Sequence, residues 1–345
     1  MSHLPARVHT EAGPGLRLVR NEVDEYGGYA PSPAFYERPL EAPDELAARQ
    51  AAEARSYLDQ VRSGRNLRFP WTDMDRVIGP LLPGWLVFVG GRAKAGKTTL
   101  LRELLTAWVE IGRTVVFVGT ETEAPVLRLS WAAVRLGIPV EDALDPECPP
   151  ALYDRLMADV RLQTTGDLAY RAIFAEAGKA TLADLTYWIE YARKAEAHAL
   201  IFDHLGQLSL QGGDRWAQVG DAIHELKRQA VAARLTLVAG AQLTQGEGGS
   251  FLGEHEVPGN KSWAGSAEVQ RTADVAIQAW RPFKFGVNAK QKREARDDAA
   301  KVEDLLQHNT MAIRVSAHRY RNSAMNKCLR LHVEHDQITS YVPRY

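Results

Sequence analysis

Eight consecutive residues near position 90 have the types and spacing that bind phosphate. They fit the pattern G-x-x-x-x-G-K-[ST] and are Gly91, Arg92, Ala93, Lys94, Ala95, Gly96, Lys97 and Thr98. In such a loop, glycines let backbone N–H groups converge on phosphate oxygens, and the start of a following helix adds partial positive charge. Lys97 is then expected to reach the outer phosphates, and the Thr98 hydroxyl to bind Mg²⁺. The alternative is a glycine-rich turn before an ordinary helix.

The segments on either side of this loop favour the phosphate-binding interpretation. An apolar run from Trp85 to Val89 precedes it, as a buried strand would, and residues 99–111 follow with helical spacing until Gly112. This order of strand, loop and helix places a helix N-terminus against a bound phosphate. We therefore predict that residues 91–98, together with Thr99, bind a nucleotide and its Mg²⁺.

Polar residues also follow three other predicted strands, so they belong at the same carboxyl edge of a sheet. Asp203 ends an apolar run, where a carboxylate could support Mg²⁺ beside the phosphate loop. Glu121 and Glu123 both follow the predicted strand 114–118, and one of these two carboxylates could orient and deprotonate an attacking water. Gln242 follows the predicted strand 235–239 and could hydrogen-bond a γ-phosphate. The alternatives are an aspartate that caps a turn and a loop amide without a role.

The overall composition is that of a soluble globular protein. The chain of 345 residues is 45% hydrophobic and 25% charged, and no apolar run approaches the length of a membrane span. The N-terminus has no apolar segment of the kind that secretion requires, and only two cysteines are present, so we expect a cytoplasmic, reducing setting. The net charge of -1 gives no general attraction to nucleic acid, so any such contact must be local.

The chain divides into three parts by composition. Residues 1–42 are rich in glycine and proline without sustained periodicity, which predicts a flexible N-terminal arm. Residues 43–66 carry an apolar stripe at helical spacing, which predicts an amphipathic linker-like helix that packs on its own domain or on a neighbouring subunit. Residues 67–345 alternate strands with helices, which favours an α/β fold with a mostly parallel sheet flanked by helices. The densely charged segment 284–308 is expected to be an exposed insertion.

Hydrophobic patterns place the elements of the third part more closely. The expected strands are residues 85–89, 114–118, 198–202, 235–239, 275–280, 313–317 and 328–333. The expected helices are residues 98–111, 124–136, 151–159, 181–195 and 216–234.

Taken together, these segments resemble the ATPase domain of the DnaB-type replicative helicases, a branch of the RecA-like P-loop superfamily. The resemblance covers residues 68–340 and rests on segments that occur in the family's order. They are Thr72–Arg76, Leu82–Gly84, the phosphate loop, Val115–Glu121, Ile201–Leu205, Ala241–Leu243, Gly265–Asp274 and Arg319–Asn322. The resemblance implies a RecA-like fold and the hydrolysis of ATP. Since most of the residues before position 67 are expected to be extended, we expect no counterpart there of the family's N-terminal helical domain.

The resemblance also implies roles at the matched positions. Glu121 falls on the family's catalytic glutamate, Asp203 on its strand-terminal Mg²⁺ aspartate and Gln242 on its γ-phosphate-sensing glutamine. Arg319 and Arg321 fall on a K-x-R pair that reaches across a subunit interface to the neighbour's nucleotide, and Arg319 replaces the lysine. The alternative for the two arginines is solvation on an edge strand.

The activity implied by the resemblance is that of a homo-oligomeric ring, expected to be a hexamer, which moves along single-stranded DNA as a helicase. Loops 208–215 and 244–264 are expected to face the central channel. In the second loop, the residues that could touch phosphate or stack on a base are Asn260, Lys261, Ser262 and Trp263. The alternative for this loop is a surface without a binding role. A recombination or repair ATPase, or a nucleotide-switched scaffold that does not unwind DNA, stays open. The arm is a candidate site for a loader.

Overall fold

The computed structural model describes most of the chain after position 41. The described residues are 42–62, 66–176, 181–205, 215–243, 258, 262–263, 266–281, 310–334 and 337–341. Residues 1–41 of the predicted arm, the predicted insertion and nearly all of the two predicted channel loops lie outside them. The chain divides into two compact units, Met1–Arg62 and Ser63–Tyr345.

The described part of the first unit is one long helix, α2, which spans Pro43–Arg62. Its ends carry charges that complement a helix dipole, with Asp44 and Glu45 in the first turn and Arg62 in the last. A helix is therefore present where the apolar stripe predicts one. Its role as a linker between subunits stays a prediction.

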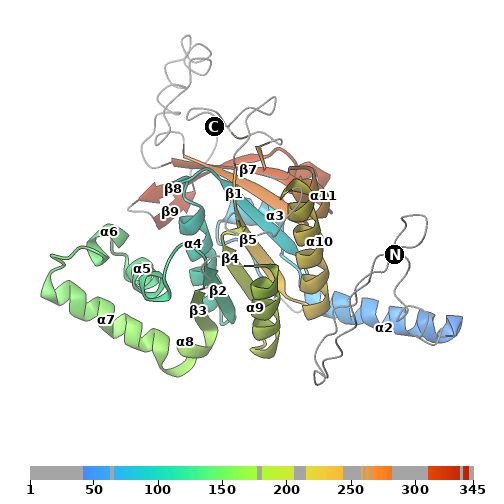
Figure 1. Cartoon of the computed structure of the whole chain (residues 1–345), viewed down its shortest axis with the longest axis horizontal. Coiled ribbons are helices and arrows are strands. Elements are labelled where there is room, and N and C mark those ends of the chain that lie inside the picture. Colours follow the sequence, from blue (N-terminus) through green and yellow to red (C-terminus); the bar gives the residue numbers. More distant parts are fainter. Residues whose placement is uncertain are drawn as a thin grey trace, which may run out of the picture. The chain divides into compact units, whose positions relative to one another are not determined.

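The second unit is built on a mixed sheet whose described part has nine strands (Figure 1). The strands are β1 Leu86–Gly91, β2 Val115–Gly119, β3 Ala172–Glu176, β4 Ala199–Asp203, β5 Thr236–Gln242, β6 Val275–Trp280, β7 Thr310–His318, β8 Cys328–Glu334 and β9 Gln337–Tyr341. Their order is β3-β2-β4-β5-β1-β6-β7-β8-β9; the first six are parallel, and β7, β8 and β9 continue antiparallel. The predicted mostly parallel sheet is confirmed. Patterning missed β3 and β9, which are short strands at the two edges.

The helices of the second unit alternate with the parallel strands, as expected. They are α3 Thr72–Ile78, α4 Lys97–Glu110, α5 Ala124–Leu136, α6 Val140–Ala143, α7 Pro150–Thr164, α8 Gly166–Arg171, α9 Leu182–Lys194, α10 Arg215–Ala233 and α11 Ser266–Thr272, with a short 3₁₀ turn, η4, at Asn322–Ala324. Across the described ranges, no helix is long and apolar enough to span a bilayer.

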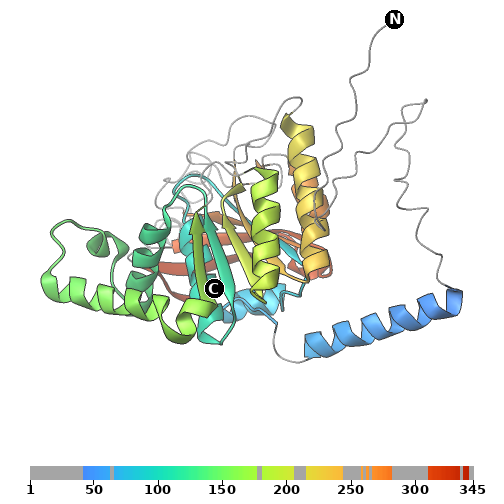
Figure 2. The same cartoon turned by 60° about the horizontal axis from the view of Figure 1, so that its bottom comes forward.

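Helices cover both faces of the sheet because the central strands are buried on both sides. In β1, Val87 and Val89 join a hydrophobic cluster with α3, α4 and α5, whereas Leu86 and Phe88 join a second cluster with α9, α10 and α11. Figure 2 shows α9 and α10 side by side on one face. A parallel strand buried in this way has a continuous apolar sequence rather than an alternating one, which explains the pattern at Trp85–Val89.

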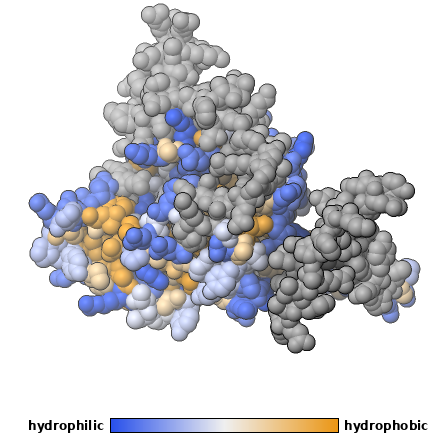
Figure 3. Space-filling view, viewed as in Figure 1, coloured by the Kyte–Doolittle hydropathy of each residue, from blue (hydrophilic) through white to orange (hydrophobic). Residues whose placement is uncertain are grey.

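An insertion of four helices, α5 to α8, connects β2 to β3 and lies to one side of the sheet (Figure 1). Its helices, α5 to α8, have a small core of their own, formed by Ala132, Ala133, Ile138 and Leu156. Orange patches of apolar side chains also appear on the visible face of the molecule in Figure 3. The sheet itself, rather than this insertion of helices, positions the residues that the sequence singled out.

Candidate ATPase site

The phosphate loop lies between β1 and α4, in the predicted strand, loop and helix context. β1 ends at Gly91 and α4 begins at Lys97, so residues 92–96 form the loop itself. Gly96 has φ of 91°, in the left-handed region, and a Cβ built there would collide with the terminal methyl of Met311. The position therefore requires glycine on two counts.

Lys97 is folded over the loop rather than extended into solvent. Its Nζ donates to the carbonyl oxygens of Gly91 and Arg92, each at 3.0 Å, and the residue is buried. Burial lowers the pKa of Lys97, and the nearby charges of Asp203 and Glu121 oppose that shift. The ammonium is thus held in a dry position where phosphate oxygens could replace the carbonyls as its partners.

Thr98 and Asp203 bring a hydroxyl and a carboxylate together at the mouth of the loop. The Thr98 hydroxyl donates to Asp203 Oδ2 at 2.7 Å. Burial raises the pKa of the Asp203 carboxyl, while the bond from Thr98 and the charges of His204 and Lys97 oppose the rise. Mg²⁺ prefers such oxygen ligands, completed by water and substrate phosphates, so these two residues fit the ion. Among the described residues, no cluster of three or more His, Cys, Asp and Glu side chains could hold a metal without such help.

Glu121 lies at the same sheet edge as Asp203, as the sequence predicted. Gly119 of β2 pairs in register with Asp203 of β4, and His204 Nε2 lies 3.2 Å from Glu121 Oε1. The His204 side chain is 7% exposed, against 52% for Glu121. A buried imidazole therefore holds one end of a carboxylate that is otherwise open to solvent. Sequence analysis missed His204, although it directly follows the strand-terminal aspartate.

Thr120 fastens the ends of β2 and β4 to each other. Its backbone N–H donates to Asp203 O at 2.8 Å, and its hydroxyl oxygen accepts from His204 N at 3.0 Å. The predicted catalytic glutamate and the predicted metal-supporting aspartate are thereby positioned by one pair of strand ends. Thr120 was also missed, because a threonine after a strand carries no distinctive signal.

Gln242 and Arg281 complete the surroundings of the loop. Gln242 is the last residue of β5 and pairs in register with Gly91, and the next backbone N–H, of Leu243, donates to Gly91 O at 3.1 Å. Arg281 follows β6, and its Cδ lies 3.6 Å from the position of a Cβ built on Gly96. Thr99, in the first turn of α4, is buried. Arg281 was not predicted, and a lone arginine after a strand gives no sequence signal.

Trp263 and Ser262 are not available to touch a nucleic acid, so the expectation for these two residues is wrong. Both are fully buried, and Trp263 Nε1 donates to Ser316 Oγ at 3.2 Å. The indole packs edge-on against Phe88 of β1. An aromatic residue in a glycine-rich segment suggested a stacking platform, but the segment returns into the core at this point.

The two predicted arginines lie at the amino ends of the parallel strands, whereas the phosphate loop lies at their carboxyl ends. We call these two ends of the sheet the arginine edge and the loop edge. Arg319 directly follows β7, and its backbone N–H donates to the carbonyl of Asp274, which precedes β6. Asp274 N in turn donates to Leu86 O, at the start of β1. Because β1 runs from Leu86 to Gly91, the two edges are separated by about 16 Å at roughly 3.3 Å per residue. One subunit does not bring its own arginines to its own loop.

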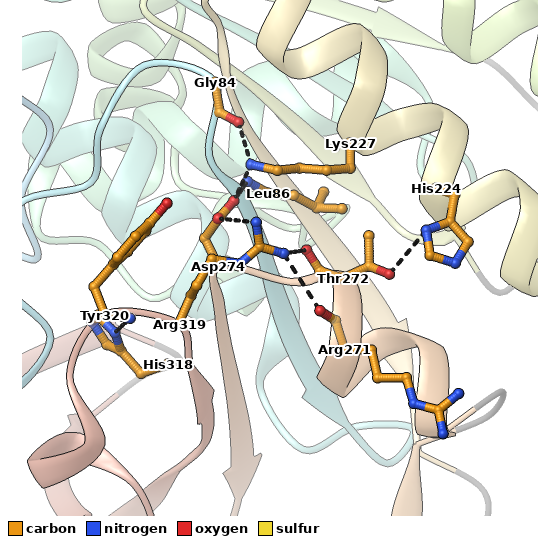
Figure 4. A network of polar contacts seen from close by, with 10 residues as sticks. All are labelled: Gly84, Leu86, His224, Lys227, Arg271, Thr272, Asp274, His318, Arg319 and Tyr320. Carbon is orange, nitrogen blue, oxygen red and sulfur yellow. Dashed lines mark hydrogen bonds and ion pairs between the residues drawn. The ribbon is translucent and has the colours of Figure 1, made fainter. Parts of the chain in front are cut away.

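Each arginine has its own set of partners. Arg319 Nη2 donates to Thr272 O at 3.0 Å, and Nη1 lies 3.5 Å from Asp274 Oδ1 (Figure 4). Arg321 Nη1 donates to Arg76 O at 3.0 Å, and its guanidinium occupies the space beside Gly79, where a Cβ would lie 2.7 Å from Cζ. Both side chains are therefore held by backbone carbonyls and are not simply solvated on an edge strand.

His318 shapes the turn between the two arginines. Its Nδ1 accepts from the backbone N–H groups of Tyr320, at 3.2 Å, and Arg321, at 3.1 Å, while Nε2 lies 2.9 Å from Ile78 O. This pattern requires a neutral ring with the proton on Nε2. Burial lowers the pKa of His318, the charge of Arg321 adds to that shift, and the Ile78 bond and Asp274 oppose it.

Comparisons with known proteins agree with this arrangement. The chain is similar to the solved structure of a DnaB-like replicative helicase determined with its interactions with primase, with 12% identity and a TM-score of 0.61 over 80% of this chain and 63% of that one. It is also similar to a second solved structure, described as an ATPase domain, with 13% identity and a TM-score of 0.63 over 88% of this chain and 100% of that one. A KaiC-like protein from Pyrococcus horikoshii OT3 shares 14% identity, with a TM-score of 0.51 over 81% of this chain and 99% of that one.

These likenesses confirm the predicted RecA-like P-loop fold. The chain spans less than two thirds of the first of these structures. No curated protein matches the sequence. The model of the DnaB-like helicase C terminal domain family, however, matches residues 67–329. Because that match covers more than half of the chain, the chain belongs to the family of DnaB-like helicase C-terminal domains.

Proposed function

We propose that this chain is the motor of a ring-forming DNA helicase, which hydrolyses MgATP at subunit interfaces and moves along single-stranded DNA. The observation that supports this most is the separation of the two edges of the sheet. The loop with Lys97 lies at one edge and Arg319 at the other, about 16 Å away along β1 at the usual strand rise. Two halves of a hydrolytic site that cannot meet within one subunit fit an assembly in which each subunit completes its neighbour's site.

The residues at the loop edge suit the first half of the reaction. In the proposed mechanism Glu121 accepts a proton from water, whose oxygen attacks the γ-phosphorus, and the bond to the β-γ bridging oxygen breaks to release ADP and phosphate. Lys97 binds the outer phosphates, and Gln242 senses the γ-phosphate. Thr98 and Asp203 hold Mg²⁺, which supplies positive charge to the phosphate oxygens when bound.

The arginines of the neighbouring subunit suit the second half. Phosphoryl transfer redistributes negative charge on the γ-phosphate, and a guanidinium placed there stabilises the transition state. Arg319 and Arg321 are the proposed source of that charge. Because they belong to another subunit, hydrolysis can change how two subunits pack, which is the step that movement along a strand requires.

The proposed partners are other copies of the chain, single-stranded DNA and a loader or other replication protein that binds the arm. The solved DnaB-like replicative helicase was described with its interactions with primase, and a primase is a further proposed partner of this chain. Since the net charge is only -1, DNA contacts would come from a few groups repeated by the symmetry of a ring.

A concentration series tests the proposal. ATP hydrolysis per subunit should rise steeply as the protein is concentrated from monomer to assembly, and single-stranded DNA should stimulate it further. A forked duplex should be unwound by the wild type and not by Lys97→Ala. A specific activity that stays flat down to monomer conditions would contradict hydrolysis between subunits, and the lack of stimulation by DNA would contradict the helicase role.

A second candidate function is a RecA-like recombination or repair ATPase, or a nucleotide-switched scaffold, that does not unwind DNA. The burial of Trp263 and Ser262 favours it, because these side chains are not available to grip a base or a phosphate. This candidate predicts hydrolysis that depends on assembly but leaves a forked duplex intact. The unwinding assay therefore separates the two functions.

A further inference from the structure

A buried carboxylate, Asp274, lies behind Arg319 and takes no part in the proposed hydrolysis (Figure 4). It sits between α11 and β6, and its side chain is wholly buried. Oδ2 accepts from Leu86 N at 2.7 Å and from Lys227 Nζ at 2.6 Å. Lys227 Nζ also donates to Gly84 O at 2.8 Å. Asp274 thus has a cationic partner, anchored on α10, that does not depend on Arg319.

The second oxygen of Asp274 faces the guanidinium of Arg319. Nη1 of Arg319 lies 3.5 Å from Oδ1, which accepts no hydrogen bond from any described residue. Nη2 donates to Thr272 O at 3.0 Å and lies 3.4 Å from Arg271 O. The guanidinium is therefore oriented by two carbonyls and by a carboxylate oxygen with unused capacity to accept.

The charges of this network do not cancel. One carboxylate faces two cations, so the group of three side chains carries a net charge of about +1 at neutral pH. The Lys227 side chain is 17% exposed and that of Arg319 is 37% exposed, so Lys227 is the inner counter-ion and Arg319 the outer one. Because Lys227 already neutralises Asp274, Arg319 keeps its charge for an anion that arrives from outside.

The carbonyl that accepts from Arg319 is itself tied to two helices. Thr272 Oγ1 lies 3.2 Å from His224 Nδ1 of α10, and His224 Nε2 lies 2.9 Å from Glu268 Oε2 of α11. The end of α11 is thereby fixed against α10. The two carbonyls that accept from Arg319 thus belong to the last residues of a helix that is tied to α10 by side-chain contacts.

From this geometry we propose that Asp274 and Lys227 are positioning residues for Arg319. The Asp274 carboxylate holds the guanidinium in one partly exposed position, where the nucleotide of a neighbouring subunit could meet it, and Lys227 prevents the same carboxylate from neutralising it. The inference rests on the proposed role of Arg319 across the subunit interface.

A double-mutant cycle in the full chain tests the inference. Asp274→Asn keeps an acceptor for Leu86 N but loses the charge that attracts the guanidinium. In the wild-type background it is expected to lower kcat for ATP hydrolysis about tenfold and to leave KM for ATP within about twofold of the wild-type value. In the Arg319→Ala background it is expected to lower kcat less than about twofold. Effects of Asp274→Asn and Arg319→Ala that multiply would overturn the inference, because Asp274 would then act independently of the arginine.

Lys227→Met provides a second cycle if Asp274→Asn does not fold, as judged by thermal unfolding. With Lys227 gone, Asp274 neutralises Arg319, so kcat is expected to fall about threefold in the wild-type background and to stay unchanged in the Arg319→Ala background. A fall in both backgrounds contradicts the inference. Glu225→Gln is the matched control, because Glu225 lies on the same helix and pairs with Arg228 instead. If Arg319→Ala alone keeps the wild-type kcat, the proposed role of Arg319 in hydrolysis is contradicted. That result differs from one in which Arg319→Ala lowers kcat but its effect multiplies with that of Asp274→Asn, which contradicts only the positioning role of Asp274.

Discussion

The two edges of the parallel sheet differ in how their charges are balanced. At the loop edge, Lys97, Asp203, Glu121 and His204 lie close together, and burial shifts the pKa of Lys97 down and that of Asp203 up, so both charged forms are disfavoured. At the opposite edge, Asp274 is already paired with Lys227, and Arg319 is a surplus cation. The first edge is arranged for a ligand that brings its own charges, and the second edge for an anion.

The two edges are therefore complementary in charge. Nucleotide phosphates with Mg²⁺ would satisfy Lys97 and Asp203 at the loop edge, and the negative charge remaining on the γ-phosphate would attract the surplus cation of another subunit. In the proposed ring, the same sheet would supply the two halves of a site to two different neighbours. The predictions below test whether the two edges act together, beginning with the largest expected effect.

Mixing two inactive variants tests the complementarity directly. Lys97→Ala should reduce hydrolysis by about 100-fold or more, because the loop loses its phosphate-binding cation, and Arg319→Ala by about tenfold to 100-fold, because the transition state loses positive charge. Mixed assemblies should regain part of the rate, since a Lys97→Ala subunit still offers its arginine to the intact loop of an Arg319→Ala neighbour. Steady-state ATPase assays of the mixture against each variant alone measure this. A mixture no faster than the average of its parts would argue against shared sites.

A smaller effect is expected from His204, which acts only at the loop edge. His204→Phe keeps the bulk of the ring but removes the contact at 3.2 Å to Glu121, so the carboxylate loses its positioning. We expect kcat to fall about threefold to tenfold, with KM for ATP nearly unchanged, because phosphate binding by Lys97 is untouched. Partial recovery in His204→Asn, which can still donate to Glu121, would support positioning. Equal losses in both variants, or a loss confined to KM, would count against it.

The buried charge of Asp203 is expected to lower the stability of the folded protein at neutral pH. Its carboxyl has a raised pKa in the folded state, so its contribution to stability is present below the ordinary pKa of aspartate and is lost as the pH rises through the raised value. Asp203→Asn should therefore raise Tm by about 2–4 °C at neutral pH while it impairs hydrolysis, and the gain should shrink in acid. Differential scanning calorimetry across pH measures this. The matched control is the buried Asp159. In Asp159→Asn the half-buried Arg135 would lose its counter-ion, and Tm should fall.

The smallest expected effect lies at the arginine edge. His318 is held neutral, and burial lowers its pKa, so its contribution to stability is present above the ordinary pKa of histidine and declines as the pH falls through it. Protonation would place a second N–H against the backbone N–H groups of Tyr320 and Arg321. The wild type should lose about 1–3 °C in Tm between pH 7 and 5 on this account, and His318→Asn should flatten that slope. An identical slope in the variant would exclude His318 as its source.

Much of the loop edge could be predicted because its signals are local. The spacing of Gly91, Gly96, Lys97 and Thr98 predicts a phosphate-binding loop. The apolar runs before Glu121 and Asp203 indicate that both residues follow buried strands. Parallel strands end at one edge, so the meeting of these side chains follows from pattern alone. β3 was missed because it begins at Ala172, directly after α8 ends at Arg171, so no turn residue marks its start. β9 was also missed.

The arginine edge could be predicted only in part. The resemblance to the family pointed to Arg319 and Arg321, but nothing in the spacing of Lys227, Asp274 and Arg319 along the chain suggests that they meet. Trp263 shows the converse, because its sequence neighbourhood suggested a surface loop while the packing against Phe88 buries it. Local pattern does not report contacts between residues that are far apart in sequence.

The amino-acid sequence by itself determined the phosphate loop, the parallel α/β core and the placement of the acidic residues at strand ends, since each depends on the residue types of one short segment. Only the tertiary structure decided that Arg319 and Lys97 lie at opposite ends of the parallel strands. It also decided that Asp274 contacts both Arg319 and Lys227, and that His204 contacts Glu121. The physical reason is that these relations depend on strand order and register, which many separate segments set together through the packing of one core.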